Sequence, residues 1–331
     1  MQILFLCQSD RFLQVYPPQL RQRLCALGAC ERIYTAEQLD QTPDAFGDVT
    51  DIFSTWGMPP LSCAQIRRFF PRLRRVFYAA GSVQQFARPF LACGVRVFSA
   101  WGANAVPVAE YTVSQIVLAN AGFFAAAALQ SAGKTQQAGK IKAQYPGNYG
   151  AKVGLLGLGM IGRRVASMLR AYTLEVLACD PFLPQETADA LGVRPASLTE
   201  IFQTCQVVSN HMANNEQTRG MLGYDLFAGM PPYATFLNTG RGAQVVEADL
   251  VRALTERPDL YAVLDVTWPE PPAPGHPFYT LPNAVLTPHI AGSKGDEVRR
   301  MAQYMFDEYQ RVIRGQPAQW EVTLPMLETM A

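Results

Sequence analysis

The fold of this chain is decided by one stretch, Val153-Gly154-Leu155-Leu156-Gly157-Leu158-Gly159-Met160-Ile161-Gly162. The apolar run before Gly157 predicts a buried strand, and a helical pattern follows Gly159, so the spacing G-x-G-x-x-G falls at a strand-to-helix junction. In this setting Gly157 permits a tight turn, Gly159 lets the backbone approach a pyrophosphate, and Gly162 lets helix and strand pack closely. The stretch therefore predicts a dinucleotide-binding site.

Two further features specify the dinucleotide. The N–H groups of Met160 and Ile161 lie at the predicted helix start, where phosphates bind. The next predicted strand ends in Asp180, roughly twenty residues after the glycines, where a carboxylate can accept hydrogen bonds from a ribose diol. A 2′-phosphate would meet like charge there, and no arginine is close in sequence, so NAD is favoured over NADP. The alternative, a glycine-rich turn in some other α/β protein, fits the spacing and context less well.

Composition limits the other classes of function. The 331 residues suffice for two domains, and Lys+Arg 28 nearly balance Asp+Glu 27, so we expect no nucleic-acid partner. Seven scattered cysteines form no metal-ligand or disulfide pattern, which indicates no metal site and a cytoplasmic location. The apolar N-terminus lacks a basic leader and predicts a first strand. The most apolar later stretch, 116–129, is too short to span a bilayer, so we expect no membrane association.

Strand and helix patterns alternate through both halves of the chain, which predicts parallel sheets covered by helices. Strands are predicted at 3–7, 32–35, 51–54, 75–79, 95–99, 152–157, 175–180, 206–210, 235–238, 262–266 and 285–287. Helices are predicted at 19–26, 64–70, 84–92 and 294–314, with one long buried helix at 108–130 and a loop at 134–150. The second half, with six strands, is predicted to be a doubly wound dinucleotide-binding domain.

Three polar residues follow three successive strands of the second half: Arg241, Glu270 and His289. The carboxyl ends of such strands meet at the edge that also carries the glycine turn. Hydride transfer to a 2-oxo acid builds negative charge on the carbonyl oxygen, and His289 is the natural proton donor. Glu270 would favour the imidazolium and orient its ring, while Arg241 would bind the substrate carboxylate or polarise the carbonyl. Each residue alone could be an ordinary surface group, but their joint position favours an active site.

Several motifs in order resemble the D-isomer-specific 2-hydroxyacid dehydrogenases. The matching stretches are 154–162, 180–181, 218–221, 238–242, 264–266 with 270–271, and 287–292, and the start of the long helix at 104–110 is also similar. The resemblance implies two doubly wound parallel-sheet α/β domains. A Rossmann-type NAD domain, residues 101–292, would be inserted in a flavodoxin-like substrate domain, residues 1–100 plus 293–331. It also implies a homodimer built on the helix around 108–130.

The resemblance further implies roles for individual residues. His289 would be the acid/base, Glu270 its partner and Arg241 the group that orients the substrate. Thr239 and Asp265 would lie near the cofactor, Asp265 beside the nicotinamide amide. The loop that contains Ala80, Gly81 and Ser82 would hold the substrate carboxylate on backbone N–H groups.

Departures from the family pattern leave the substrate open. Residues 81–85 lack the frequent acidic residue, and 99–102 and 210–215 differ from the usual text. Trp56 is either a wall of the substrate pocket or a core residue, and His211 is interpreted as lining the cofactor cleft. Glyoxylate, hydroxypyruvate, pyruvate and aromatic oxo acids all remain candidates. The alternative functions are a formate-type dehydrogenase, which Glu270 disfavours, and an NAD(H)-binding sensor or scaffold on the same fold.

Overall fold

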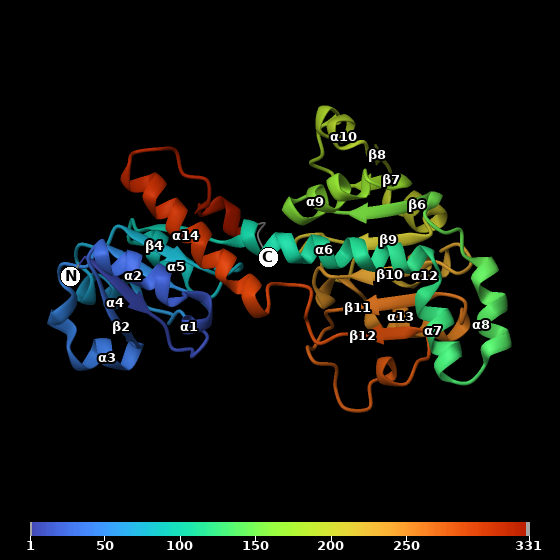
Figure 1. Cartoon of the computed structure of the whole chain (residues 1–331), viewed down its shortest axis with the longest axis horizontal. Helices are drawn as coiled ribbons and strands as arrows, with labels where there is room; N and C mark the ends of the chain where they lie inside the picture. Colours follow the sequence, from blue (N-terminus) through green and yellow to red (C-terminus); the bar gives the residue numbers. More distant parts are fainter. Residues whose placement is uncertain (1, 329–331) are drawn as a thin grey trace. The chain divides into compact units, whose positions relative to one another are not determined.

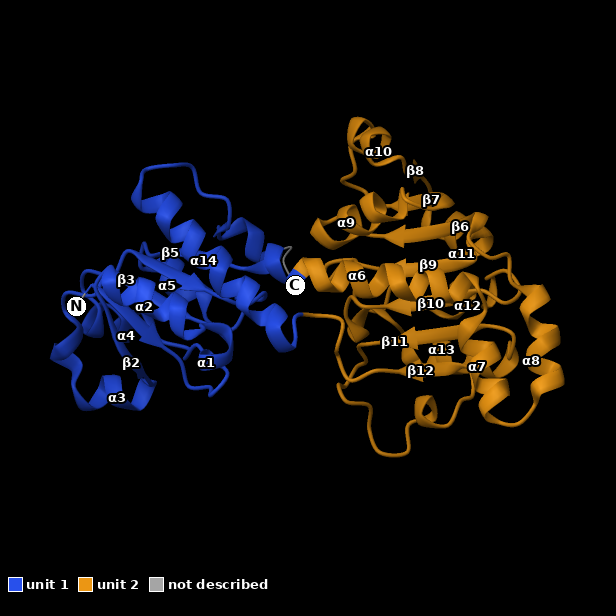
Figure 2. Ribbon diagram, viewed as in Figure 1, with its two compact units in different colours: residues 1–104, 293–331 blue, residues 105–292 orange. Residues whose placement is uncertain are grey.

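The computed structural model describes residues 2–328, and the chain divides into two compact units (Figure 2). Unit 1 comprises residues 1–104 and 293–331, and unit 2 comprises residues 105–292. Each unit is built on one mainly parallel sheet with helices on both faces. The prediction of two doubly wound parallel-sheet domains is confirmed.

The sheet of unit 1 has the order β13-β5-β4-β3-β1-β2. Figure 1 labels its strands β2 and β4. Its strands are β1 (Ile3–Leu6), β2 (Ala29–Tyr34), β3 (Asp51–Ser54), β4 (Arg75–Tyr78), β5 (Arg96–Ser99) and β13 (Glu321–Val322). The first five are parallel and run in the order 2-1-3-4-5, the flavodoxin-like arrangement. The two-residue strand β13 pairs antiparallel with β5, a feature that the sequence pattern did not predict because two residues carry no periodicity.

Two apolar cores flank this sheet. On one face lie α1 (Phe12–Val15), α2 (Pro18–Ala26) and α14 (Val298–Ile313). On the other lie α3 (Ala36–Gln41), α4 (Cys63–Phe69) and α5 (Ala87–Ala92). Met301 and Met305 of α14 are fully buried in the first core, so the C-terminal helix completes unit 1.

The sheet of unit 2 has the order β12-β11-β10-β9-β6-β7-β8. Its strands are β6 (Tyr149–Leu156), β7 (Thr173–Cys179), β8 (Arg194–Pro195), β9 (Val207–Asn210), β10 (Thr235–Asn238), β11 (Tyr261–Leu264) and β12 (Ala284–Leu286). All pairs are parallel. Renumbered along this unit the order is 7-6-5-4-1-2-3, the dinucleotide-binding arrangement with one added strand, and its switch point lies between β6 and β9.

Helices cover both faces of the second sheet. The face that contains Val165 and Leu169 packs against α6 (Trp101–Asn120), α9 (Met160–Leu169) and α10 (Gln185–Leu191). The opposite face packs against α11 (Leu198–Thr204), α12 (Tyr224–Ala228) and α13 (Glu247–Glu256). Both sets of helices leave the carboxyl edge of the strands to loops.

The prediction of one helix over 108–130 and a loop over 134–150 was wrong in two respects. The helix α6 begins at Trp101, ends at Asn120 and is followed by α7 (Phe123–Ser131), bent by 70°. Gly122 stands at the break with φ 72, and a Cβ there would lie 2.4 Å from the Tyr145 ring. The expected loop contains α8 (Thr135–Ile141), whose Gln, Ala and Lys residues are good helix formers. No single described helix is long and apolar enough to cross a membrane, and only the bent pair α6–α7 passes that test jointly.

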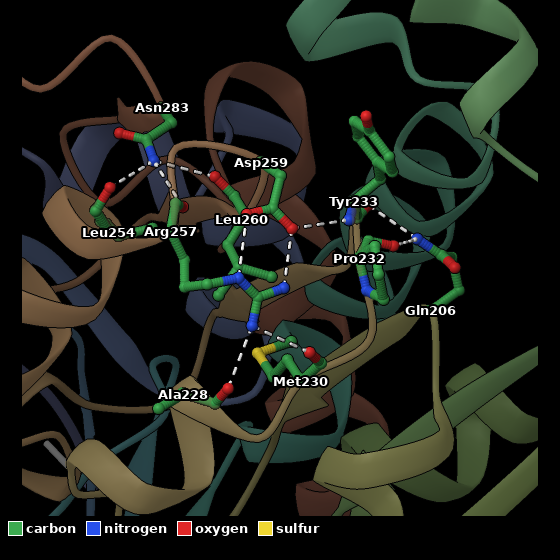
Figure 3. Close-up of polar contacts among 10 residues, drawn as sticks. All are labelled: Gln206, Ala228, Met230, Pro232, Tyr233, Leu254, Arg257, Asp259, Leu260 and Asn283. Carbon is green, nitrogen blue, oxygen red and sulfur yellow. Dashed lines mark hydrogen bonds and ion pairs between the residues drawn. The ribbon is translucent and has the colours of Figure 1, made fainter.

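A polar cluster connects the segments that precede β10, β11 and β12 at the amino ends of these strands (Figure 3). The guanidinium of Arg257 donates to both carboxylate oxygens of Asp259, at 2.9 and 2.7 Å, and to the carbonyl oxygen of Ala228 at 3.0 Å. Asp259 also accepts from the N–H of Tyr233, whose φ of 62 is left-handed. The buried Asn283 amide donates to three carbonyl oxygens before β11, those of Leu254, Arg257 and Leu260. These contacts lie at the amino ends of the strands, at the edge of the sheet opposite the glycine turn.

Candidate active site

The glycine turn after β6 has close backbone approaches at Gly157 and Gly162 and open space at Gly159. Gly157 has φ +87, and a Cβ there would lie 2.8 Å from the carbonyl oxygen of His211. A Cβ at Gly162 would lie 2.1 Å from the carbonyl oxygen of Gly157, so only glycine lets α9 start so close to the turn. A Cβ at Gly159 would meet nothing within 4 Å. The protein therefore leaves open space at the glycine that is expected to face the pyrophosphate.

The start of α9 fits a bound phosphate group. The helix has no side-chain cap, and among residues 2–328 no acceptor lies within hydrogen-bonding distance of the N–H groups of Met160 and Ile161. Asp180 follows β7, and its carboxylate accepts from the N–H of Leu158 at 2.6 Å and of Phe182 at 2.8 Å. The acid is thereby held beside the glycine turn, where it was expected to meet the ribose of NAD.

His211 follows β9 on the other side of the switch point. Its Nε2 lies 2.9 Å from the Ser209 hydroxyl, while its Nδ1 is buried without a partner in the described part of the chain. Burial lowers the pKa of His211 to about 4, so the ring is neutral above that pH. A buried ring nitrogen without a partner beside Gly157 is consistent with a bound polar group such as the cofactor.

The structure brings Glu270 and His289 into direct contact. Nδ1 of His289 lies 2.7 Å from Oε1 of Glu270, and both side chains are about two-fifths to one-half exposed, at 47% and 39%. Burial lowers the pKa of Arg241, while the negative charge of Glu270 raises it. Arg241 is thus close enough to Glu270 for their charges to interact. The three residues that follow β10, β11 and β12 converge at one edge of the sheet.

Asp265 fixes the turn that carries His289. Its carboxylate accepts from the Thr287 hydroxyl at 2.6 Å and from the N–H groups of Ile290 and Ala291 at 2.8 and 2.9 Å. Its backbone oxygen accepts from the N–H of His289 at 3.1 Å. His289 has φ 52, a left-handed conformation that only the surrounding contacts can hold. Asp265, which is 2% exposed, therefore positions the imidazole through the backbone.

The loop that carries Arg241 is packed as tightly as the turn that carries His289. A Cβ at Gly242 would lie 2.0 Å from the carbonyl carbon of Thr267, so glycine is required there. Nη1 of Arg241 donates to the carbonyl oxygen of Gly240 at 2.7 Å. Thr239 reaches the Thr112 hydroxyl of α6 at 3.2 Å, which joins this loop to the helix.

Sequence reasoning missed a buried amide cluster formed by Asn210, Asn238 and Gln244. Nδ2 of Asn210 donates to Oδ1 of Asn238 at 3.0 Å and to Oε1 of Gln244 at 2.6 Å. Gln244 also accepts from the N–H of Arg241 and donates to the carbonyl oxygens of Met212 and Ala213. The available signal was a polar residue at the end of each of the apolar strands Val207–Asn210 and Thr235–Asn238.

Glu247 of α13 makes two contacts that the sequence did not indicate, with Trp268 and His276. Its Oε1 accepts from the N–H of Trp268 at 2.7 Å, and its Oε2 lies 3.6 Å from Nε2 of His276. Burial raises the pKa of Glu247. Trp268 precedes Glu270 by two residues, so this carboxylate holds the segment that carries the histidine's partner.

The residues expected to bind the substrate carboxylate lie in unit 1, after β4. The Ser99 hydroxyl lies 2.9 Å from the carbonyl oxygen of Ala80 and 2.5 Å from that of Gly81. Within the described range, the N–H groups of Gly81 and Ser82 have no acceptor. Ser99 thus fixes the carbonyls of a loop whose N–H groups are free for an anion. Trp56 is half-buried and packs against the cores on both faces of the sheet.

Residues 2–328 contain no group of three or more His, Cys, Asp or Glu side chains that could hold a metal ion.

A two-domain protein with a dinucleotide turn and an Arg, Glu and His set at one sheet edge is typical of a nicotinamide-dependent dehydrogenase. The sequence profile described as "D-isomer specific 2-hydroxyacid dehydrogenase, NAD binding domain" matches residues 117–291. This chain belongs to that family, and NAD is the cofactor of its unit 2.

Individual relatives agree with this assignment. D-3-phosphoglycerate dehydrogenase of Archaeoglobus fulgidus is 31% identical over 238 residues, which is 71% of this chain and 44% of that protein. (S)-sulfolactate dehydrogenase of Chromohalobacter salexigens is 30% identical over 220 residues, which is 66% of this chain and 70% of that protein. The NAD-complexed D-isomer specific 2-hydroxyacid dehydrogenase of Lactobacillus delbrueckii ssp. bulgaricus has a TM-score of 0.79 at 19% identity, covering 98% of this chain and 100% of that chain. The chain spans less than half the length of the Archaeoglobus relative.

Proposed function

We propose that this protein is an NAD-dependent oxidoreductase that interconverts a small 2-oxo acid and its D-2-hydroxy acid. The observation that carries the proposal is the contact of 2.7 Å between Nδ1 of His289 and Oε1 of Glu270, beside the charge of Arg241. A histidine held in this way presents its other ring nitrogen, Nε2, for proton transfer.

In the reductive direction NADH supplies the hydride when it is bound. His289 donates a proton from Nε2 to the carbonyl oxygen as negative charge develops there, and in the oxidative direction it takes that proton back. Glu270 accepts from Nδ1, orients the ring and stabilises the imidazolium. Arg241 places a fixed positive charge on the substrate carboxylate or carbonyl oxygen. Asp265 keeps His289 in its left-handed conformation throughout.

We further propose that Gly81 and Ser82 bind the substrate carboxylate through their backbone N–H groups. Support comes from the Ser99 hydroxyl, which occupies the carbonyl groups of the same loop. In unit 2 the proposed cofactor residues are Gly157, Gly159, Met160, Ile161, Gly162, Asp180, His211, Thr239 and Asp265.

The two alternative functions are less well supported. In a formate-type dehydrogenase the histidine's partner would be an amide, whereas Glu270 is a carboxylate that suits proton transfer. An NAD(H)-binding sensor or scaffold would not need the left-handed His289 or the contact between His289 and Glu270. The relatives named for phosphoglycerate and sulfolactate act on 2-hydroxy acids, in keeping with the proposed reaction.

The experiment is a reductase assay with NADH and a panel of 2-oxo acids. Turnover is measured as the decrease in NADH absorbance. We expect turnover that falls by about 100- to 10,000-fold in His289→Ala, the range for removal of a general acid. NADH binding, measured by fluorescence titration, should be retained in the same variant. NADH binding by the wild type without turnover of any 2-oxo acid would favour the sensor.

Glu270→Gln tests the partner of His289 separately. The amide oxygen can still accept from Nδ1, but the negative charge is gone, so we expect a loss of turnover smaller than that in Glu270→Ala. The matched control is Glu186→Gln on α10, which should leave turnover unchanged. Equal turnover in wild type and Glu270→Ala would remove Glu270 from the mechanism.

We also propose a cytoplasmic homodimer in which α6 and α7 of one copy meet those of the other. The dimer is supported by α7, which is rich in alanine and whose Phe123 is 48% exposed. The cytoplasmic location is supported by the seven cysteines, which are all free thiols. Light scattering after gel filtration should give twice the chain mass for the wild type and a lower value for Phe123→Glu.

A further inference from the structure

Unit 1 has a switch point of its own, which the proposed carboxylate loop does not account for. The strand order β2-β1-β3 places it between β1 and β3, since the chain proceeds outward from there in both directions. Ligands of open α/β sheets bind at such points, outside the carboxyl ends of the strands. The loops that leave β1 and β3, residues 7–11 and 55–58, occupy this position in unit 1.

These two loops are joined into one rigid surface. The Cys7 thiol donates to the carbonyl oxygen of Trp56 at 3.1 Å, and the N–H of Gln8 donates to that of Gly57 at 2.8 Å. Gly57 has φ +98, and a Cβ there would lie 2.8 Å from the backbone and Cβ of Ser9. The close approach requires glycine, and it fixes Trp56 beside the end of β1.

Arg11 supplies a cation on this surface. Its Cζ lies 5.7 Å from the centre of a Trp56 ring, and its side chain is exposed. Arg11 forms no ion pair with any acid of residues 2–328. Asp10 is the one acidic residue and Arg11 the one basic residue in the three segments 7–11, 55–62 and 80–87, so Arg11 is the only side-chain cation that these segments offer to an anion.

The same surface continues to the proposed carboxylate loop. The Thr55 hydroxyl donates to the carbonyl oxygen of Ala79 at 2.8 Å, which connects the loop after β3 to the loop after β4. One edge of unit 1 therefore presents the free N–H groups of Gly81 and Ser82, the apolar ring of Trp56 and the guanidinium of Arg11. This order suits an anion with an acid group at each end and a short carbon chain between them.

We propose that the substrate is a 2-oxo acid with a second anionic group at its far end, a carboxylate or phosphate, which Arg11 binds while Trp56 contacts the intervening carbons. This inference rests on the proposed function and specifies the substrate class of that reaction. Arg11 and Trp56 are then the residues that determine specificity, and neither takes part in proton transfer.

The experiment compares pairs of substrates that differ in the charge of the tail. The pairs are 2-oxoglutarate with 2-oxoglutaramate, in which an amide replaces the far carboxylate, and 3-phosphohydroxypyruvate with hydroxypyruvate. We expect the holoenzyme to prefer the anionic member of at least one pair by about 10- to 100-fold in kcat/KM, the effect of a charge-assisted hydrogen bond. Which pair shows the preference identifies the anionic group.

Arg11→Gln should abolish this preference, mainly through KM of the anionic substrate, and Arg11→Lys should restore part of it. The matched control is Arg32→Gln, because Arg32 also lies over an aromatic ring in unit 1, 4.9 Å from that of Tyr34. Trp56→Phe keeps a ring under the guanidinium and should retain more of the preference than Trp56→Leu. Thermal unfolding of each variant reports whether it is folded.

The outcomes separate this inference from the proposed function. Reduction of neutral and anionic substrates with equal kcat/KM, or a preference that survives Arg11→Gln, would overturn the role of Arg11 and leave the dehydrogenase reaction intact. Failure of every 2-oxo acid to be reduced would overturn the proposed function, and the substrate class with it.

Discussion

The side-chain amide of Asn210 donates a hydrogen bond to Oε1 of Gln244 at 2.6 Å, and both side chains are completely buried. Asn210 ends β9, beside the proposed cofactor site, and Gln244 lies in the loop that begins with Arg241. Because Oε1 of Gln244 also accepts from the N–H of Arg241, the pair couples the position of the guanidinium to the loop after β9.

Gln244→Leu should therefore reduce both stability and catalysis. The variant removes one of the two acceptors of the Asn210 amide and the side-chain acceptor of the Arg241 N–H. It also removes the donor to the carbonyl oxygens of Met212 and Ala213, and each buried polar group left without a partner costs about 1–3 kcal/mol. We expect a lower midpoint of urea unfolding and a lower kcat/KM with NADH. The control, Gln185→Ala on the exposed surface of α10, should change stability by no more than about 0.5 kcal/mol. A Gln244→Leu variant with the midpoint and kcat/KM of the wild type would show that the cluster positions nothing.

The parts of the candidate site that could be predicted from sequence are those where the local backbone requires a particular residue type, or where a polar residue directly follows a predicted strand. Gly157 and Gly162 stand where any side chain would collide with backbone, and glycine at these spacings is visible in the sequence. Arg241, Glu270 and His289 could be placed at one edge because each follows a predicted strand. The contact between Asn210 and Gln244 could not be predicted, since it joins the end of β9 to a loop 34 positions further along the chain and depends on the register of β9 with β10.

Most of the fold could also be predicted from sequence, apart from one helix break and the shortest strands. Alternating apolar runs identified most strands, and the glycine turn identified the class of the second unit. The break at Gly122 was missed because the apolar, alanine-rich pattern continues across it, and the turn becomes necessary only when Tyr145 packs against it. The strands β8 and β13, of two residues each, are too short for any pattern to indicate them.

Gly159→Ala should weaken cofactor binding without destabilising the fold. The added Cβ would meet no protein atom within 4 Å, and the φ of −68 is ordinary for alanine. The methyl group would instead occupy the space expected for the pyrophosphate. We expect an unchanged Tm for the protein without NADH and a Kd for NADH raised by about tenfold, equivalent to ~1.4 kcal/mol. Gly139→Ala in α8, where a Cβ also meets nothing, is the control for both measurements. An unchanged Kd would exclude close approach of the dinucleotide at Gly159.

Asp180→Asn should reduce the preference for NADH over NADPH. The carboxylate repels a 2′-phosphate, and its replacement by an amide removes the charge while one oxygen can still accept from Leu158. We expect the ratio of the two kcat/KM values to fall by about tenfold. Asp189→Asn removes a carboxylate of the same unit whose one side-chain hydrogen bond within residues 2–328 comes from Gln185, and should leave the ratio unchanged. A wild-type protein that already prefers NADPH would contradict the ribose assignment of Asp180.

His211 should make the protein less stable in acid. Burial lowers the pKa of His211 from its ordinary value of 6.5 to about 4. Between these two values the unfolded chain binds a proton that the folded chain does not, so the free energy of unfolding falls as the pH drops from 6.5 to 4. Above pH 6.5 neither state is protonated at this residue, and the contribution is constant. At 1.36 kcal/mol per pKa unit, the full loss is on the order of 3 kcal/mol. His211→Gln cannot titrate and retains a group that can bond the Ser209 hydroxyl, so its urea unfolding should depend less on pH over the same interval. Identical pH dependence in the two proteins would mean that His211 takes up its proton equally well in the folded state, and that its ring is not desolvated.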